Sequence, residues 1–348
     1  MKLTRDCCAV VTMGLLALPI AVLAHHSMAE FDRTVTLELE GELIDVSWTN
    51  PHVLLWLSTT DENGNEAIWE LESNAVSAQR RRGLTGDLVE VGQQVRIAGS
   101  PSTRRDAYLQ VHNILRPDGV ELLMGGGRVA RWSENTIGGD PWSVDPEKAA
   151  AARGEGIFRV WSRAIGTWYF GADRGGYRLT PEAAAASAAW DDIEDNPILD
   201  CVPPGMPALI GNPYPMEFVQ VGDVIELRFE EFDLVRRIHL DSTVDPADVA
   251  ASPLGYSAGN WDGDTLMVTT TRINWPYFDR VGAPQSTDVV VEEAFRAVDD
   301  GEGLEYTMTV TDPSTLLEPF VWEAAWEWRR GEEVGRYDCT LEEMAGGR

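Results

Sequence analysis

The stretch T-V-T-L-E-L-E-G-E-L-I-D-V-S-W-T-N-P-H-V-L-L-W-L-S-T-T, residues 34–60, decides the fold of the first half of the chain. Apolar and polar side chains alternate along two runs, and a Trp-Thr-Asn-Pro-His element separates them. Alternation with a period of two is typical of half-buried β-strands. Gly41 interrupts the first run at a point where a long strand could bend. These residues predict two neighbouring strands, at about 35–48 and 52–59.

The residues that follow predict the rest of a small barrel. D-E-N-G-N at 61–65 is a turn signal before a third run at 67–71, and Ser73 can cap a short helix that Gly83 would end. Two more strands are expected at 94–99 and 108–115. Three strands, a helix and two strands is the element order of the OB-fold, a five-stranded barrel. We therefore expect an OB-like domain over residues 25–118.

The second half of the chain predicts a different β domain. Residues 119–155, with G-G-G at 125–127 and little periodicity, read as a connection, and Thr180 followed by Pro181 starts a helix further on. Short alternating runs then recur with hairpin turns, notably at Asp262-Gly263. The pattern predicts an antiparallel β-barrel or sandwich, a lipocalin-like meander, over residues 156–348, with strands at 216–220, 224–229, 234–240, 265–270, 289–297, 304–311 and 320–329.

The amino terminus has the pattern of a secretory signal peptide. Lys2 and Arg5 precede an apolar run at 9–24, and Val22 and Ala24 are the small residues that signal peptidase prefers. Removal of residues 1–24 would change the formal net charge from −29 to −30. We expect a periplasmic or secreted bacterial protein without a membrane span. Its acidity argues against nucleic-acid partners, because the phosphates would be repelled.

Cysteine usage fits export. Only Cys201 and Cys339 would remain after removal of the signal peptide, and in an oxidising compartment two such cysteines predict one structural disulfide.

Two motif groups resemble known families. H-H-S-M-A-E-F-D at 25–32, followed by the Trp-x-Asn-Pro-His element, is similar to secreted bacterial proteins grouped as a domain of unknown function. The run G-Y-S-A-G-N-W-D-G-D-T-L from Gly255 is similar to a second uncharacterised secreted family, in which His is commoner where Tyr256 stands and Asp-Gly-Arg where residues 241–243 stand. The resemblance implies no established activity.

The paired histidines raise a metal-binding hypothesis. A chain that begins at His25 would offer its amine and imidazole together, and His26, His52 or His112 could add a second imidazole, a nitrogen-rich set that suits copper and also zinc. A frayed terminus with adventitious metal affinity is the alternative. The strand order alone leaves open whether the terminus reaches His52. The candidate metal ligands are His25, His26 and His52.

Candidate ligand-binding residues lie in the second half. Arg237, Asp241, Trp261 and Asp264 occupy a strand end and a hairpin, and Ser257 is central to a Gly-x-Ser-x-Gly sequence. That sequence does not predict a hydrolase, because the last histidine, His239, precedes it and no helix follows. Trp261, Trp275, Trp322, Trp326 and Trp328 suit either an apolar cavity or an ordinary core.

The sequence thus favours a binding protein, for a small hydrophobic ligand in the second domain or a metal ion at the first, without turnover. The first alternative is a lipocalin-like barrel enzyme, an isomerase, cyclase or hydrolase, with Asp241 or Asp264 as general base. The second is a structural or interaction module of the cell envelope. No catalytic residue is assigned, and the ligand, the metal and the oligomeric state stay open.

Overall fold

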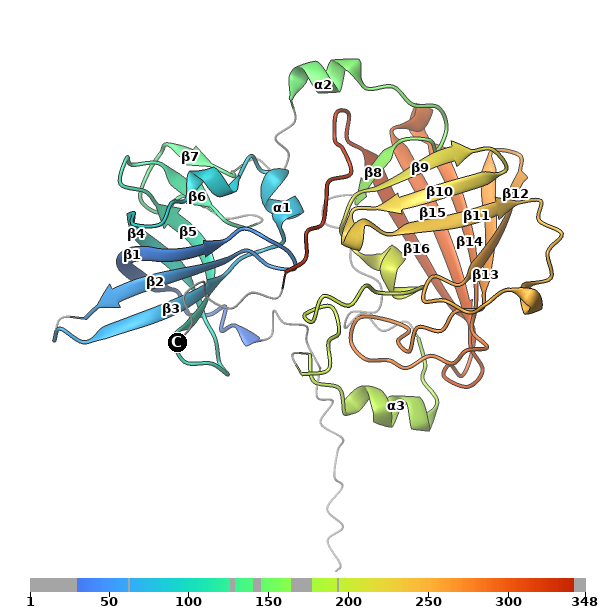
Figure 1. The fold of residues 1–348 in the computed structure, drawn as a ribbon, viewed down its shortest axis with the longest axis horizontal. Helices are drawn as coiled ribbons and strands as arrows, with labels where there is room; N and C mark the ends of the chain where they lie inside the picture. Colours follow the sequence, from blue (N-terminus) through green and yellow to red (C-terminus); the bar gives the residue numbers. More distant parts are fainter. Residues whose placement is uncertain are drawn as a thin grey trace, which may run out of the picture.

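The computed structural model describes residues 30–61, 63–125, 129–139, 145–163, 177–192 and 194–340. Figure 1 shows two β-barrels side by side, with the last described segment, in dark red, running between them. The mostly β fold expected from the sequence is confirmed, with a closed five-stranded barrel in the first half and a closed nine-stranded barrel in the second.

The first barrel has the predicted order of elements. β1 pairs with both β2 and β4, and a parallel pairing of β3 with β5 closes the ring. The register of β1 against β2 shifts between Leu43 and Asp45, and such a bulge bends a strand so that it can serve two neighbours. The elements are β1 (Leu37–Ser47), β2 (Leu54–Thr60), β3 (Glu66–Glu72), α1 (Val76–Arg80), η2 (Gly86–Leu88), β4 (Gln94–Pro101) and β5 (Tyr108–Leu115).

The interior of this barrel explains the apolar alternation. Leu43, Leu55, Leu57 and Leu71 have no exposed surface and form one apolar cluster. Gly41 stands where β1 and β2 approach closely, since a Cβ there would lie 2.1 Å from the carbonyl oxygen of Ser58. Any other residue would push the two strands apart.

The start of α1 differs from the prediction. Ser73 does not cap it, because its hydroxyl donates to the carbonyl of Met124 at 3.0 Å. Ala75 holds the N-cap position, and the carboxamide oxygen of Asn50 accepts the Val76 N–H at 3.1 Å. Asn50, 26 positions earlier in the chain than Val76, therefore accepts a helix N–H in place of the expected Ser73. A rule that considers only neighbouring residues cannot predict this contact.

Part of the expected connection extends the first sheet. β6 (Glu121–Leu123) pairs with β5, and β7 (Thr136–Ile137) pairs with β6. The fully buried Glu121 carboxylate accepts the backbone N–H groups of Arg131, Trp132 and Ser133. α2 (Pro146–Ala151) follows, above the gap between the barrels in Figure 1.

The second barrel closes with nine strands in the order β10-β11-β12-β13-β14-β15-β16-β8-β9. All neighbours are antiparallel except β11 and β12, which are parallel. The predicted strands are present, whereas β8 and β12 were not predicted as strands. The elements are β8 (Val160–Arg163), α3 (Pro181–Ala188), η3 (Ala208–Gly211), β9 (Met216–Val221), β10 (Val224–Phe229), η4 (Glu231–Asp233), β11 (Val235–Leu240), η5 (Pro246–Asp248), β12 (Tyr256–Asp262), β13 (Thr265–Thr271), β14 (Val290–Val298), η6 (Asp299–Gly301), β15 (Gly303–Thr311) and β16 (Phe320–Trp328). Thr180 caps α3 as predicted, accepting the Ala183 N–H at 3.3 Å.

Side chains fill the second barrel. Trp161, Phe218, Phe295 and Trp326 are buried in one apolar cluster. The buried Arg236 guanidinium pairs with the Glu293 carboxylate and also donates to Ser257 and Thr270. Tyr306 adds a hydrogen bond of 2.9 Å to Glu293. Burying this ion pair away from water costs free energy, and the hydrogen bonds to the surrounding side chains offset that cost.

The C-terminal segment joins the two barrels. Asn50 donates a side-chain hydrogen bond to the carbonyl of Tyr337, and its backbone pairs with the chain at Cys339. Arg80 of α1 lies 2.7 Å from Glu230, which also accepts the Gly335 N–H. The loop that carries the Trp-x-Asn-Pro-His element is thus held against the second domain.

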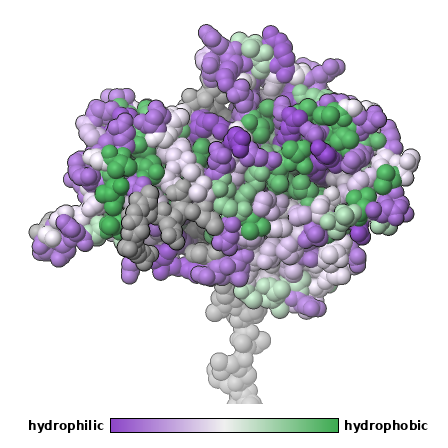
Figure 2. All heavy atoms as spheres, in the orientation of Figure 1, coloured by the Kyte–Doolittle hydropathy of each residue, from purple (hydrophilic) through white to green (hydrophobic). Residues whose placement is uncertain are grey.

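The surface matches the acidic composition. Hydrophilic residues cover much of the face in Figure 2, interrupted by hydrophobic patches on both barrels. Among the residues that the structure describes, none of the helices is long and apolar enough to cross a membrane.

Candidate functional site

A cluster of polar side chains lies at one end of the first barrel. His52 stands on the loop between β1 and β2, and Arg105 on the loop between β4 and β5. These are the two loops with which OB barrels commonly hold ligands. Glu72 at the end of β3 and Tyr108 at the start of β5 lie between them, brought together by the parallel pairing of β3 with β5.

Glu72 connects a histidine to a tyrosine. Its Oε1 lies 3.3 Å from His52 Nδ1, and its Oε2 accepts the Tyr108 hydroxyl at 2.5 Å. Both the Glu72 and the Tyr108 side chains are buried, so the carboxylate is fixed in orientation.

This pairing shifts all three pKa values. Burial opposes the charge on His52, but the adjacent Glu72 carboxylate outweighs it and raises the His52 pKa above its ordinary value. Burial would raise the Glu72 pKa, yet His52 and the Tyr108 hydrogen bond hold it below its usual range. Burial and then the Glu72 charge raise the pKa of Tyr108 far above normal. Glu72 is therefore an ionised acceptor for both neighbours at neutral pH.

The second imidazole nitrogen of His52 stays available. A carboxylate only accepts, so Nδ1 carries the hydrogen, and Nε2 of the neutral ring keeps a lone pair. The structure shows no hydrogen bond or ion pair to Nε2 from the described residues, and the side chain is 28% exposed. A histidine whose Nδ1 is held by a carboxylate is the usual arrangement of a metal ligand or a general base.

The segment that precedes β1, residues 30–31, is anchored beside this cluster. Arg105 holds the Glu30 carboxylate with two bonds, of 2.6 and 2.8 Å, and Ser102 donates to the same carboxylate at 2.7 Å. The ring of Phe31 stacks on Tyr108 with 5.7 Å between centroids. The Arg105 guanidinium lies 3.3 Å from the Tyr108 ring centroid. Residues 30–31 are thus fixed next to the tyrosine that bonds Glu72.

The second domain contributes charge to this end of the first barrel. Arg280, on the loop between β13 and β14, is close enough for its charge to oppose protonation of His52. Arg104 pairs with Asp191 of the second domain at 2.9 Å.

The other predicted metal ligands have different positions. His25 and His26 lie outside the described residues. His112 is buried on β5, with its Nε2 at 3.4 Å from the Ser100 hydroxyl. In the described part of the chain, no three His, Cys, Asp or Glu side chains gather as a metal-binding group.

The predicted ligand-binding residues do not form one cluster. Ser257 points into the second barrel, where Arg236 and Thr270 bond its hydroxyl. All four of the others are exposed: Arg237 lies within β11, Asp241 directly follows it, and Trp261 and Asp264 lie on the β12–β13 hairpin. Their binding role, and that of Asp241 or Asp264 as a general base, stays a prediction.

Cys201 and Cys339 form the predicted disulfide. It ties the segment between α3 and η3 to the C-terminal segment that pairs with Asn50.

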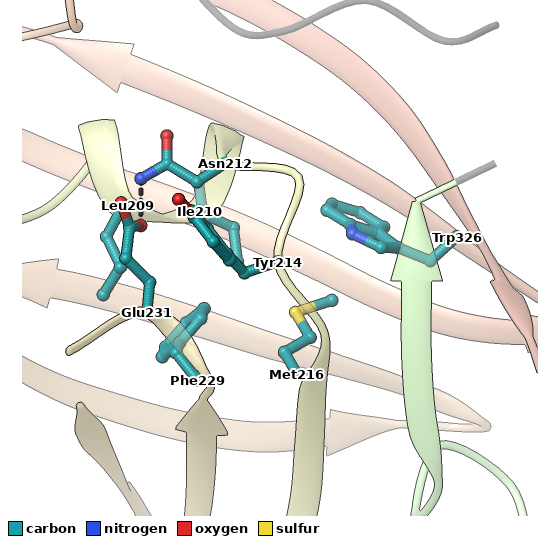
Figure 3. Close-up of a pocket in the computed structure, with 8 residues that line it drawn as sticks. All are labelled: Leu209, Ile210, Asn212, Tyr214, Met216, Phe229, Glu231 and Trp326. Carbon is teal, nitrogen blue, oxygen red and sulfur yellow. Dashed lines mark hydrogen bonds between the residues drawn. The ribbon is translucent and has the colours of Figure 1, made fainter. Parts of the chain in front are cut away.

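Sequence reasoning missed Glu72, Tyr108 and Glu231. Glu72 and Tyr108 lie at strand ends, and the OB element order, which pairs β3 with β5, could have placed them together. Nothing local marks Glu231, which is fully buried on η4 and accepts a hydrogen bond from the Asn212 amide (Figure 3).

Residues 13–108 match the model of a family described as a family of unknown function, DUF6152. The matched range contains His25, His26, His52 and Glu72, and it ends at Tyr108. No curated protein and no solved structure matched the chain.

Proposed function

We propose that the first barrel binds a transition-metal ion, with His52 Nε2 as one ligand. The observation that carries this proposal is the Glu72 carboxylate at 3.3 Å from His52 Nδ1, with Nε2 left unpartnered by the described residues. Such a carboxylate fixes the ring and increases the basicity of the ligating nitrogen.

His25 and His26 supply the further ligands in this proposal. Glu30 and Phe31 are anchored beside Tyr108, which bonds the partner of His52. His26 lies four positions before Glu30, and an extended chain spans up to about 14 Å over four positions. The anchored segment therefore supports contact between the paired histidines and His52.

Imidazole and amine nitrogens suit copper(II) and zinc, and copper(II) takes the higher place in the order of affinities. The proposal includes export and cleavage after Ala24, because only a chain that starts at His25 offers amine and imidazole on the same residue. The cleaved chain, whose formal net charge changes from −29 to −30 on loss of residues 1–24, would attract cations in general.

Calorimetric titration with Cu²⁺ and Zn²⁺ tests the proposal, on exported protein whose amino terminus is verified by mass spectrometry. We expect one-to-one binding that is lost in His52→Ala and in His25→Ala. Glu72→Gln should weaken affinity by about 10- to 100-fold, because it removes the group that orients the ligand. His239→Ala is the matched control, since His239 lies on β11 of the second barrel and stacks on Tyr256.

Equal affinity in wild type, His52→Ala and His239→Ala would overturn the site. Loss in His25→Ala with none in His52→Ala would reduce it to a terminal chelate that does not involve the barrel. Circular dichroism spectra of each variant exclude unfolding as the cause.

A further inference from the structure

The first half of β3 has an open edge. β2 pairs with β3 over its whole length, whereas β5 pairs with Glu70–Glu72 alone. Among the residues that the structure describes, residues 66–69 therefore have a hydrogen-bonded strand on one side only. Figure 1 shows this end of the β2–β3 hairpin extending beyond the rest of the first barrel, on the side away from the second barrel.

The backbone groups of Glu66 and Ile68 point toward the open side. Along a strand of an antiparallel pair, alternate residues bond to the partner strand, and the N–H and C=O groups of the residues between them face away from it. The Glu70 N–H faces away from β2, since it donates to the carbonyl of Ala107 on the β5 side. Ile68 and Glu66, two and four positions earlier, belong to the same set. On that side, no described residue bonds to their backbone groups.

This edge lacks the features that usually protect one. Proteins blunt exposed edges with lysine, proline, a bulge or a covering segment. Residues 66–69, Glu-Ala-Ile-Trp, contain neither lysine nor proline, and their register against β2 is regular. Glu66, Ala67 and Ile68 are exposed, with half of the Ile68 surface open to solvent. The edge is therefore accessible to a further strand.

The two faces of β3 differ in character. Glu66 and Glu70 lie on the outer face, with Ile68 between them. Ala67 and Trp69 lie on the inner face, since Trp69 packs against the apolar cluster of the barrel. A strand that matches both faces would carry basic side chains on the outer face and apolar side chains on the inner face. Its sequence would therefore alternate between basic and apolar residues.

The charge of the surroundings favours a basic partner. Arg104 and Arg105 of the neighbouring β4–β5 loop are paired with Asp191 and Glu30, whereas Glu66 has no ion pair among the described residues. A second copy of this chain would bring its own Glu66 and a formal net charge of −29 to the edge. Like charges on adjacent strands are destabilising. The partner is therefore a different, positively charged chain.

We propose that residues 66–69 bind an extended protein segment in which basic and apolar residues alternate. The segment adds a strand to the open side of β3, with its backbone bonded to that of Glu66 and Ile68. Its basic side chains lie on the outer face, and its apolar side chains lie on the inner face. This site goes beyond the metal site and is separate from it, since His52 contacts Glu72 at the opposite end of β3.

Three hexapeptides with blocked ends test the proposal on the full chain. Lys-Val-Lys-Val-Lys-Val has the proposed pattern, Glu-Val-Glu-Val-Glu-Val reverses the charge, and Lys-Lys-Lys-Val-Val-Val keeps the charge without the alternation. We expect the alternating lysine peptide to bind about tenfold more tightly than either of the others. Amide chemical-shift changes in NMR spectra of the isotope-labelled protein measure the affinities, and they should centre on residues 66–69.

Ile68→Pro tests the backbone contact. It removes an N–H that faces away from β2, so the β2–β3 pairing keeps its own hydrogen bonds. The variant should bind the alternating lysine peptide about tenfold less tightly, which corresponds to about one hydrogen bond. Circular dichroism verifies that the variant is folded.

Glu66→Lys tests the charge contact. It should weaken binding of the alternating lysine peptide and strengthen binding of the glutamate peptide, each by about two- to fivefold. Glu292→Lys is the matched control, because it makes the same change of charge at an exposed position on β14 of the second barrel. The control should keep the wild-type affinities.

Equal affinity for the two lysine peptides would overturn the proposal, because it would show attraction by net charge alone. Equal affinity for the two alternating peptides, or no binding of the alternating lysine peptide, would also overturn it. These comparisons use wild type, so they decide the matter even where Ile68→Pro does not fold. Unchanged affinity in a folded Ile68→Pro protein would contradict the added strand.

Discussion

At the scale of single residues, Asp279 shows what burial does to an acid. Its side chain is almost fully buried and accepts the backbone N–H groups of Val281 and Ala283 and the hydroxyl of Tyr177. Burial is the largest influence on this carboxyl group and raises its pKa to about 6. The same loop carries Arg280, which lies 3.7 Å from the Glu231 carboxylate. The hydrogen bonds to Asp279 therefore stabilise the loop that positions this arginine.

The free energy of unfolding should therefore fall as pH rises from about 4 to about 6. The folded state keeps a proton on Asp279 that the unfolded chain, with a pKa of 3.8, has lost. This contribution is fully present below about pH 4 and is lost as pH rises through about 6. Two pKa units correspond to about 3 kcal/mol. Urea unfolding of wild type and Asp279→Asn across this range measures it, and parallel curves would contradict the expected loss.

At the scale of elements, Asn50 joins three segments that are far apart in sequence. Its Oδ1 accepts from the first turn of α1, and its Nδ2 donates to the carbonyl of Tyr337. Its own carbonyl accepts the N–H of Thr340 at 3.1 Å. The loop that carries His52 is therefore positioned by contacts with α1 and the C-terminal segment as well as by its own strands.

Asn50→Ala should lower stability by about 1–3 kcal/mol, because it leaves a helix N–H and a buried carbonyl without partners. It should also weaken metal affinity at His52, two residues on, whereas an alanine at the exposed turn residue Asn63 should change neither. Thermal unfolding and the copper titration measure the two effects. A stable Asn50→Ala protein would show that water replaces both bonds.

At the scale of the whole molecule, the disulfide and the C-terminal segment hold the barrels together. Cys201 and Cys339 are 138 positions apart. Between β16 and Cys339, the segment contributes Tyr337, which is buried against Tyr214 and Phe232 of the second domain. Cys339 itself pairs with Asn50 of the first barrel.

The double variant Cys201→Ser, Cys339→Ser should lose about 2–5 kcal/mol, because the unfolded chain is no longer constrained by a long loop. The C-terminal segment should become sensitive to proteases, and calorimetry should resolve the two barrels as separate transitions. Reduction of wild type should reproduce both effects. A single transition, with the segment still protected, would mean that the non-covalent contacts suffice.

Local patterns determined much of the fold. The alternation of apolar residues and the turns at 61–65 and 262–263 predicted the OB order of the first barrel and most strands of the second, because strand periodicity and turn chemistry depend on neighbouring residues. Thr180 likewise predicted its helix. β12 escaped prediction because its sequence, Y-S-A-G-N-W-D, lacks a regular alternation of apolar and polar residues.

The candidate site depended far more on tertiary structure. The sequence singled out His52 as a metal ligand, but not Glu72 and Tyr108, which orient it from the ends of two other strands. Closure of the first barrel brings those strands together. The buried Asn212 and Glu231 side chains likewise meet only when η3 and η4 pack together at one end of the second barrel. Sequence by itself determined which segments become strands, since that choice is local; only the tertiary structure decided which polar groups are buried together, because burial depends on residues distant along the chain.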